Sequence, residues 1–284
     1  MKKALFCLIA TLIAAPLLAA ECGRYDRPYM STSEHGEAFT LQNALTNYVI
    51  NFRYIHPKPN RPAQVCMAMP RPVPRTGFCR FNFSFLKING IDSRTLEPKK
   101  FEIFNTKDSS GVDVHYNFDG VPMILRLSVS DSSPLLKLTW RRGEGNAINI
   151  IRTMSIDFIV WPCAAGEEKD SYSREVVSPA GKYAAPQGVR FIKQKLTARD
   201  TYLIFQDTVR QSGEGSKYEA PVVLFPDWKG IVSGELRVGI SQGVNVRFVL
   251  NPKATEWSFG LLETEKKRTN AEFLEFLNGL KIVP

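Results

Sequence analysis

The sequence has few residues of the kinds that bind metals or cofactors. Its 284 residues include five cysteines and three histidines, and no Cys-x-x-Cys pair occurs. His35, His56 and His115 lack the spacing of metal ligands. A glycine-rich phosphate loop and a dinucleotide-binding fingerprint are also missing. We therefore expect neither a metal site nor a cofactor.

The longest apolar run near the N-terminus, Ala4–Leu18, is too short to span a bilayer comfortably, which takes about 20 apolar residues. It follows Lys2-Lys3 and ends in Ala19-Ala20, a pattern typical of a secretory signal peptide. We predict that residues 1–20 are removed, that the protein is secreted or periplasmic, and that no transmembrane segment remains. A bacterial lipoprotein anchored at Cys22 is the alternative, although Glu21 stands where lipid modification needs a small residue.

Removal of the signal leaves four cysteines and lowers the formal charge from +9 to +7. An even number of cysteines in an exported chain suggests two disulfides. Of the three possible pairings we predict Cys66–Cys79, which closes a short proline-rich loop, together with Cys22–Cys163. Free buried thiols are the alternative. The modest positive charge mildly favours acidic partners such as anionic glycans.

The stretch from Val112 to Trp161 predicts a four-strand antiparallel meander. Asp119-Gly120 is a strong hairpin signal, because a two-residue type I′ turn needs positive φ at both positions. That turn places Asp113 opposite Arg126 on a polar face. It places four apolar pairs on the other face: Phe118 with Val121, Tyr116 with Met123, Val114 with Leu125 and Val112 with Leu127.

Two more turns extend this predicted sheet. The loop Asp131–Pro134 sets Leu127 against Leu138, so the third strand shares the apolar face. A third turn at residues 141–146 leads into a fourth strand over residues 147–161.

Strands are also predicted on both sides of the meander, followed by a helix. A three-residue turn at Ser241–Gly243 sets Leu236 against Phe248 in a late hairpin. Thr269–Glu272 is a capping box that opens a short helix with one apolar face. The predicted strands are 44–55, 77–88, 101–104, 189–196, 201–205, 221–225, 231–240, 244–250 and 257–261.

Two stretches lack a strand pattern. Residues 56–75 contain six prolines among several Lys and Arg residues. Because proline removes hydrogen-bond donors, we predict an extended surface loop, which is either a basic lip that contacts a polymer or a rigid connector. Residues 164–186 are rich in charge, Ser and Pro, and they form a possible boundary between two halves. We predict one large domain over residues 21–284.

Few residues are candidates for catalysis. Gly239–Gly243 matches the Gly-x-Ser-x-Gly elbow, but it lies between two strands, whereas the elbow needs a strand-to-helix turn. His115 could transfer a proton beside Asp113; a solvated strand face with an Asp113–Arg126 pair is the alternative. Asp157 would need a second carboxylate for glycoside hydrolysis, and the predicted registers supply none.

Exposed aromatic residues are candidates for sugar binding. Trp228 lies in the turn Pro226–Gly230, where burial is difficult, and Trp161 ends a strand on its polar face. An indole offers an apolar ring face to sugar C–H groups and an N–H to a hydroxyl. Simple packing is the alternative for Trp228. The candidate ligand-binding residues are therefore Trp228, Trp161 and His115.

The C-terminal run contains Asn251-Pro252 and then Glu256-Trp257-Ser258-Phe259-Gly260-Leu261-Leu262-Glu263-Thr264. It resembles the last strand of sandwich domains in exported glycoside-hydrolase-like proteins. The many-stranded pattern over residues 100–264 also resembles the galactose-mutarotase-like supersandwich of carbohydrate enzymes. Glu265 stands where those proteins have a proline, and no catalytic barrel follows. The resemblance therefore implies a carbohydrate-related binding or accessory domain without a catalytic partner.

Together these patterns predict an exported, all-β protein. Its fold would be a large two-layer antiparallel β-sandwich, supersandwich-like, with a short C-terminal helix. We expect it to bind a glycan or another cell-envelope polymer, without catalysis and without a nucleic-acid partner. A carbohydrate-active enzyme and a structural envelope protein are the alternatives, because a fold by itself does not set a function.

Overall fold

The described part of the chain in the computed structural model contains three antiparallel β-sheets and one α-helix. The structure describes residues 19–24, 36–55, 59, 64–72, 81–144, 150–160, 174–186, 188–207, 222–239, 244–263 and 270–280. The four-stranded sheet has the order β1 (Glu21–Arg24), β2 (Gly36–Gln42), β3 (Asn47–Ile55) and β4 (Gln64–Pro72). The nine-stranded sheet has the order β13 (Gly181–Ala184), β12 (Arg174–Ser178), β15 (Leu203–Asp207), β16 (Val222–Pro226), β19 (Glu256–Glu263), β10 (Leu136–Arg142), β9 (Val121–Ser130), β8 (Ser109–Phe118) and β7 (Lys100–Asn105). The six-stranded sheet has the order β14 (Phe191–Leu196), β17 (Ile231–Gly239), β18 (Val244–Leu250), β11 (Met154–Val160), β5 (Phe81–Ile88) and β6 (Ile91–Asp92).

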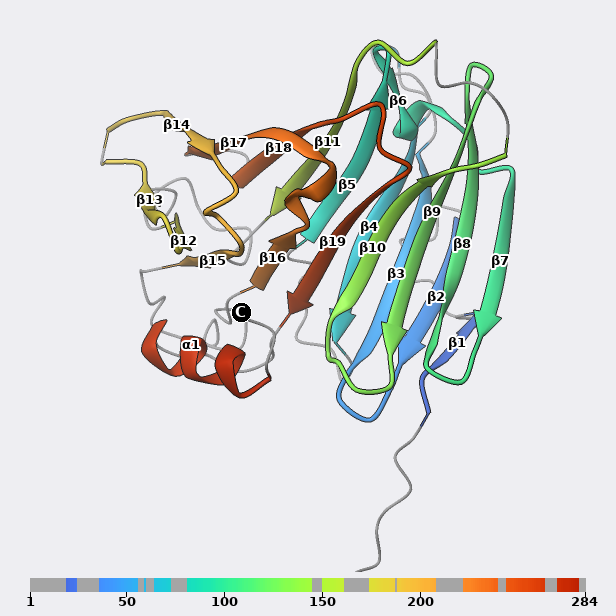
Figure 1. Cartoon of the computed structure of the whole chain (residues 1–284), viewed down its shortest axis with the longest axis horizontal. Coiled ribbons are helices and arrows are strands. Elements are labelled where there is room, and N and C mark those ends of the chain that lie inside the picture. The colour runs from blue at the N-terminus through green and yellow to red at the C-terminus, as the bar shows by residue number, and fades with distance from the viewer. Residues whose placement is uncertain are drawn as a thin grey trace, which may run out of the picture.

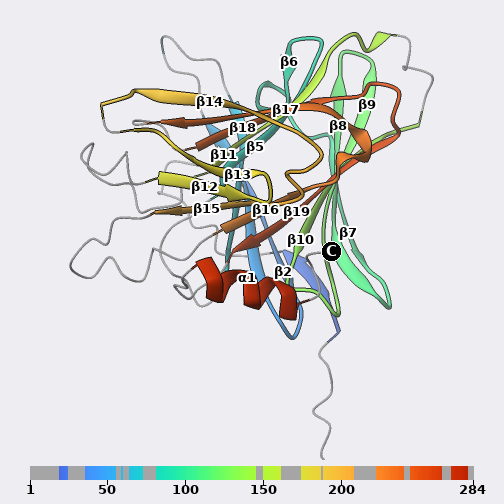
Figure 2. The same cartoon turned by 60° about the vertical axis from the view of Figure 1, so that its left-hand side comes forward.

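The nine-stranded sheet forms one layer, and the other two sheets lie behind it (Figure 1 and Figure 2). Apolar side chains from all three sheets meet between the layers, among them Phe52 of β3, Trp140 of β10 and Phe158 of β11. Each is buried at 0–1% exposure, and burial of this apolar surface is the main force that holds the layers together. The predicted two-layer antiparallel β-sandwich is confirmed.

The predicted meander is confirmed for its first three strands, β8, β9 and β10. Every pair predicted across the first turn is present, including Asp113 with Arg126. The pair predicted across the second turn is present as well. Asp119 and Gly120 have φ of 51° and 85°, as a type I′ turn requires.

The prediction of a fourth meander strand at residues 147–161 is wrong. β11 crosses to the six-stranded sheet and lies between β5 and β18, while β19 takes the place beside β10. Both sheets bury one apolar face against the same core. The alternation that buries Ile156 and Phe158 therefore fits either sheet, and it could not show where the chain changes layer.

The predicted hairpin of β17 and β18 exists, but its register differs by two residues. Leu236 faces Val246 rather than Phe248, and Phe248 faces Gly234. A shift of two residues keeps every side chain on its face, so the apolar alternation fits both registers. Residues 240–243, which contain the predicted turn, lie outside the described residues.

Parts of both stretches predicted to be irregular are strands. β4 falls within residues 56–75 and is an edge strand, and its register with β3 shifts between Val49 and Asn51, near Pro70. Edge positions and bulges are the places where a sheet tolerates proline. Within residues 164–186, β12 and β13 form one edge of the nine-stranded sheet.

The predicted C-terminal helix is confirmed as α1 (Asn270–Gly279). It covers part of the outer face of the nine-stranded sheet, the face turned away from the core (Figure 1). Its Leu277 is buried in a second cluster with Ile204, Val223 and Leu262. The outer face is therefore apolar under the helix. Among the described residues, no helix is long and apolar enough to cross a membrane.

Cys22 has a free, buried thiol, and burial raises the pKa of that thiol to about 12. The structure thus lacks the disulfide predicted for Cys22, because the side chain points into the core from β1. Its predicted partner Cys163 lies outside the described residues, as do Cys79 and the side chain of Cys66. The Cys66–Cys79 disulfide stays a prediction.

Candidate functional site

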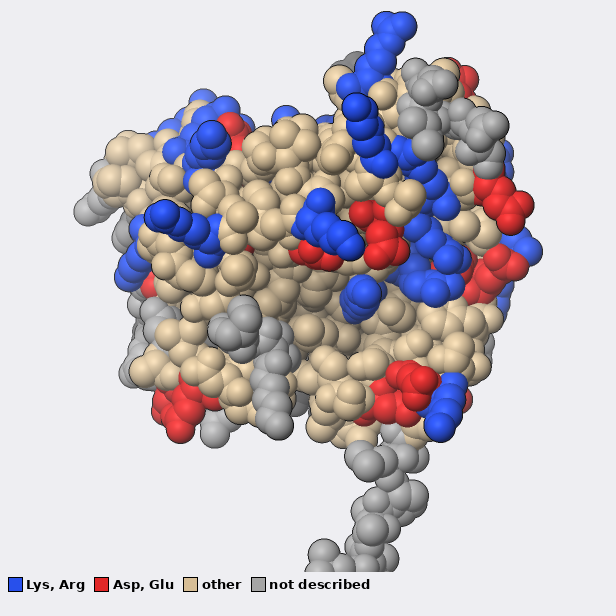
Figure 3. All heavy atoms as spheres, in the orientation of Figure 1, with Lys and Arg blue, Asp and Glu red and all other residues tan. Residues whose placement is uncertain are grey.

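A pocket of about 600 Å³ opens on the outer face of the nine-stranded sheet. It is lined by residues of β7, β8, β9, β10, β19 and β16, of the loop after β9, and by Asp227, which follows β16. Figure 3 shows this side of the molecule, where a hollow near the centre is bordered by acidic and basic side chains. Small-molecule sites in proteins have about this volume.

The strand registers align the polar side chains of the pocket in rows across the sheet. One row consists of Asp113 on β8, Arg126 on β9, Thr139 on β10 and Ser258 on β19. Asp227 extends it, because its backbone N–H donates to the Ser258 carbonyl at 3.0 Å. The Thr139 and Ser258 hydroxyls are buried and hydrogen-bonded to each other at 2.9 Å. Charged groups and hydroxyls from distant parts of the chain therefore lie side by side on the pocket floor.

The next row places two aromatic rings at the ends of the pocket and two glycines beside them. A Cβ on Gly111 would lie 2.8 Å from the Phe104 Cζ, and one on Gly260 would lie 3.3 Å from the Phe225 Cβ. The missing side chains leave the space that the phenylalanines occupy. In order across the sheet the row is Phe104, Gly111, Ser128, Lys137, Gly260 and Phe225.

Asp113 is a buried carboxylate that holds two arginines beside the pocket. Arg126 donates to it from Nε and Nη2, both at 2.7 Å, and Arg141 donates from Nη2 at 2.8 Å. The Asp113 side chain is 9% exposed, whereas Arg126 and Arg141 are 37% and 38% exposed. The Arg126 guanidinium also stacks over the Phe104 ring at 4.4 Å. We call Asp113, Arg126 and Arg141 the arginine clamp.

The hydrogen bonds to Asp113 raise the pKa of Arg126 above its ordinary value. The exposed parts of Arg126 and Arg141 border the pocket.

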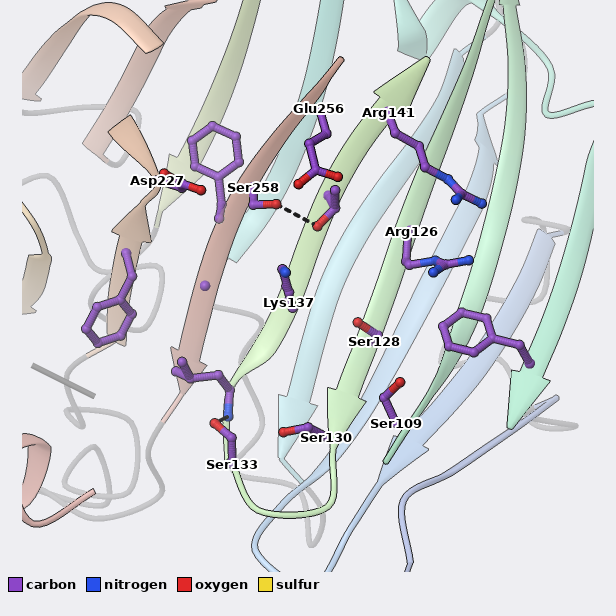
Figure 4. A pocket seen from close by; sticks show the side chains of 16 residues that line it. Ser109, Arg126, Ser128, Ser130, Ser133, Lys137, Arg141, Asp227, Glu256 and Ser258 are labelled. Atoms are coloured by element: carbon purple, nitrogen blue, oxygen red, sulfur yellow. Dashed lines mark hydrogen bonds between the residues drawn. The ribbon is translucent and has the colours of Figure 1, made fainter. Parts of the chain in front are cut away.

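The other charges of the pocket are distributed unevenly. Lys137 lies near the middle of the view in Figure 4, with the clamp arginines on one side and Asp227 on the other, and Glu256 on β19 lies directly opposite Arg141 in the register. Lys137 and Glu256 make no ion pair with any described residue. Asp227 accepts a hydrogen bond from the Lys229 backbone at 3.1 Å. The pocket thus has a cationic side on β9 and β10 and an acidic side near β16 and β19.

Helix α1 contributes an apolar boundary to the pocket through residues that it contacts. Leu135 and Phe225 line the pocket and also pack against the cluster around Leu277. A polar floor beside an apolar wall suits a ligand that has hydroxyls on its edges and C–H groups on its faces.

His115 lies on the same outer face, but it does not line the pocket. Its Nε2 is 2.5 Å from Glu102 Oε2, and Lys100 binds the same carboxylate. Hydrogen bonds from Lys100 and from His115 lower the pKa of Glu102. The partner of His115 is therefore Glu102, and Asp113 is occupied by the clamp arginines.

Trp228 is half-buried in a 3₁₀ turn, Trp228–Gly230. Its ring packs edge-to-face on Phe248 with centroids 5.7 Å apart, and its N–H donates to the Asp200 carbonyl at 3.0 Å. The fold thus uses both the ring and the polar group that sugar binding would need. Trp161, the other candidate tryptophan, lies outside the described residues.

Asp157 lies on the solvent-facing side of the six-stranded sheet, in the other layer. It accepts from Arg247 Nε at 2.6 Å and pairs with Lys87 at 3.3 Å, and Lys87 reaches Asp92 at 3.8 Å. This arrangement is an ion-pair network rather than a pocket. Ser241 lies outside the described residues, and among the residues that are described no His, Cys, Asp and Glu side chains gather to hold a metal ion.

The sequence analysis named none of Lys137, Arg141 and Glu256 as candidates. A signal for Glu256 was present, because Glu256 and Ser258 alternate with the buried Trp257 and Phe259. That alternation shows which way each side chain faces, but it does not show that β19 lies beside β10.

No protein-family model matches the sequence, and no curated protein is significantly similar to it. Solved structures resemble the fold. A TPR-domain containing protein from Parabacteroides distasonis has a TM-score of 0.51 at 10% identity, over 89% of this chain and 54% of that one. An α-N-acetylgalactosaminidase from Bifidobacterium bifidum, in complex with GalNAc, has a TM-score of 0.47 at 7% identity, over 85% and 36%.

An α-galactosidase from Lactobacillus brevis has a TM-score of 0.45 at 10% identity, over 83% of this chain and 40% of that one. The chain thus spans about half or less of the length of these proteins. At such identities the likeness concerns the fold alone.

Proposed function

We propose that this is an exported protein that binds a saccharide in the pocket on the outer face of its nine-stranded sheet. The observation that carries the proposal is the composition of one pocket of about 600 Å³. Charged side chains, buried hydroxyls and an apolar wall converge there, which is the chemistry that orients a sugar. Export rests on the signal-peptide pattern of residues 1–20.

The pocket takes the place of the tryptophans as the proposed binding site. Phe104 and Phe225 supply the aromatic surface, and the hydroxyls of Ser128, Thr139 and Ser258 supply donors and acceptors. The side chains stand on strands of one sheet, so the site is largely preformed and binding orders little of the chain.

The experiment is a glycan array followed by affinity electrophoresis of the mature protein. Gly260→Leu fills the floor of the pocket, and Lys137→Ala removes its central cation. We expect both variants to lose the retention that the wild type shows. Lys195→Ala is the matched control, because Lys195 is exposed on the edge strand β14, away from the pocket. Circular dichroism checks that Gly260→Leu folds.

Two outcomes would refute the proposal. One is that no glycan retains the wild-type protein. The other is that Gly260→Leu and Lys137→Ala are retained as strongly as Lys195→Ala. Trp228→Ala is expected to behave like the control, because its indole N–H is already bonded within the fold.

A carbohydrate-active enzyme is the second candidate, and one observation favours it. Glu256 and Asp227 line the same pocket, and glycoside hydrolysis generally uses two carboxylates. Release of reducing sugar by the wild type, lost in Glu256→Gln while binding persists, would establish this activity. Absence of turnover on every glycan that binds would leave the binding function alone.

A further inference from the structure

We infer that the arginine clamp recognises an acidic group on the ligand, a carboxylate or a sulfate carried by the saccharide. This inference rests on the proposed function and specifies the class of glycan. It starts from three groups: the buried carboxylate of Asp113 and the guanidinium groups of Arg126 and Arg141, which that carboxylate orients.

Asp113 fixes both guanidinium groups before any ligand arrives. It accepts three charge-assisted hydrogen bonds, two from Arg126 and one from Arg141. Phe104 supports the face of Arg126 at 4.4 Å. Arginine side chains lose much rotamer freedom when they bind a ligand, and here the bonds to Asp113 have already taken part of that freedom, so ligand binding is weakened less.

Some hydrogen-bond donors of the arginine clamp are not used to bind Asp113. Arg126 uses Nε and Nη2 for Asp113, and Arg141 uses only Nη2, which leaves Nη1 of both residues without a partner among the described residues. The Nε of Arg141 is buried and has no hydrogen-bond partner in the described part of the chain. Buried donors are normally paired. The Nη1 groups of Arg126 and Arg141 are not buried in this way, so they are the donors that an acidic oxygen in the pocket could reach.

The charges on this side of the pocket do not balance. The clamp contributes two cations against one carboxylate, and Lys137 adds a further cation with no ion pair to any described residue. Glu256 on β19 is the cross-strand neighbour of Arg141, and Asp227 lies beyond it, next to Ser258. An acidic ligand would therefore be held in one orientation, with its anionic group at the clamp and its hydroxyls toward the carboxylates.

The experiment compares three polymers by affinity electrophoresis of the mature protein: polygalacturonate for carboxylates, dextran sulfate for sulfates, and unmodified dextran as the neutral probe. Arg141→Gln removes one clamp arginine and keeps the two hydrogen bonds between Asp113 and Arg126. We expect its affinity for the acidic polymer to fall by about tenfold or more, the effect of one charge-assisted hydrogen bond.

Arg247→Gln is the control, because Arg247 also donates to a buried aspartate, Asp157, but on the other layer. Its affinity should stay at the wild-type value. If the affinity for polygalacturonate falls in Arg141→Gln, the preferred group is a carboxylate. If the affinity for dextran sulfate falls, the preferred group is a sulfate.

The outcomes separate this inference from the proposed function. Equal retention on dextran and on both acidic polymers would overturn the inference and leave saccharide binding intact. Acidic binding that is lost in Arg247→Gln and kept in Arg141→Gln would overturn it as well, because the polymer would then bind the other layer. No retention on any glycan would overturn both.

A second observation, independent of the pocket, concerns the start of the mature chain. Ala20 is 6% exposed. Its backbone N–H donates to Asp131 Oδ1 at 2.6 Å, and the buried Ser110 hydroxyl donates to its carbonyl at 2.5 Å. Cleavage after Ala20 would remove this residue and leave the Ser110 hydroxyl without that partner, at a cost to stability.

We infer that a signal peptidase hydrolyses the Ala19–Ala20 bond, with water as the co-reactant. The sequence pattern from which removal of residues 1–20 was predicted fits this site as well, because each cut has an alanine before it and a leucine, Leu17 or Leu18, two residues further upstream. Hydrolysis at Ala19–Ala20 leaves a carboxylate on Ala19 and a charged α-amino group on Ala20. That amino group would bind the Asp131 carboxylate by a charge-assisted hydrogen bond.

Intact-mass measurement and N-terminal sequencing of the exported full-length protein decide the point. We expect Ala20 as the first residue. A chain that begins at Glu21, or one that keeps its leader, would overturn this second inference and leave the pocket argument untouched.

Discussion

Two cross-strand ion pairs of similar geometry should differ in strength, and a double-mutant cycle on each can measure the difference. Asp113–Arg126 joins β8 and β9, and Asp157–Arg247 joins β11 and β18. The first pair has two hydrogen bonds of 2.7 Å, and the second has bonds of 2.6 and 3.2 Å. Each aspartate keeps a second cation when its arginine is removed.

Solvent access separates the two pairs. The carboxylates are similarly buried, at 9% and 11%, but the arginines are 37% and 54% exposed. Arg126 also stacks on an aromatic ring, which is Phe104. Hydrogen bonds to charged groups contribute about 1.5–3 kcal/mol when they are shielded, and exposed pairs contribute about 0.2–1 kcal/mol. Because Arg126 is more than a third exposed, we expect a coupling free energy of about 1.5–2 kcal/mol for Asp113–Arg126 and about 0.5–1 kcal/mol for Asp157–Arg247.

The assay is urea unfolding of the wild type, the four alanine single variants and the two double variants, with coupling taken from the cycle. The coupling of Asp157–Arg247 should fall more with added salt, because its arginine is the more exposed. Equal couplings, or a larger value for Asp157–Arg247, would show that burial and ring stacking do not set the strength of these pairs.

Three further predictions concern buried positions in the strands. Cys22, whose thiol pKa is raised to about 12 by burial, should resist alkylation in the native state and react in urea without reductant; failure to react there would point to a disulfide with Cys163. Gly111→Ala should lower the free energy of unfolding by about 1–3 kcal/mol, because the new Cβ would lie 2.1 Å from a backbone oxygen. Gly23→Ala is the control, because its new Cβ would have only a 3.8 Å contact. It should change the free energy of unfolding by less than about 0.5 kcal/mol in the same urea titration. Leu138→Ala should cost about 2–5 kcal/mol, because Leu138 is fully buried; a smaller shift of the urea midpoint would mean that the layers close over the cavity.

Local features of the fold could be predicted because turn chemistry and alternation are properties of adjacent residues. Asp119-Gly120 fixed the pairing of β8 with β9, and that pairing already placed Asp113 beside Arg126. The choice of sheet could not be predicted in the same way. β11 and β19 both present one apolar face to the same core, so a residue pattern cannot show which of them lies beside β10.

The candidate site depends on the pairing of β19 with β10, which could not be predicted from the sequence. Half of the clamp follows from the first hairpin, but Glu256 and Ser258 reach the pocket only because β19 pairs with β10 across more than a hundred residues. The candidate Trp228 was chosen because turns are usually exposed, and the structure instead packs its ring against Phe248. An exposed turn position is a weak guide when a large side chain can fold back onto the core.

The outer face of the nine-stranded sheet has two parts with different surroundings, and the boundary between them defines the site. Near β15 and β16 that face carries Ile204 and Val223, and α1 covers it through Leu277. Along β19 the outer positions change from Glu256 and Ser258 in the pocket to Leu262 under the helix. Without α1, an apolar surface would adjoin the polar floor and favour association with other proteins over selective binding of a sugar. The helix is therefore part of the site, although its role is to end the pocket rather than to contact the ligand.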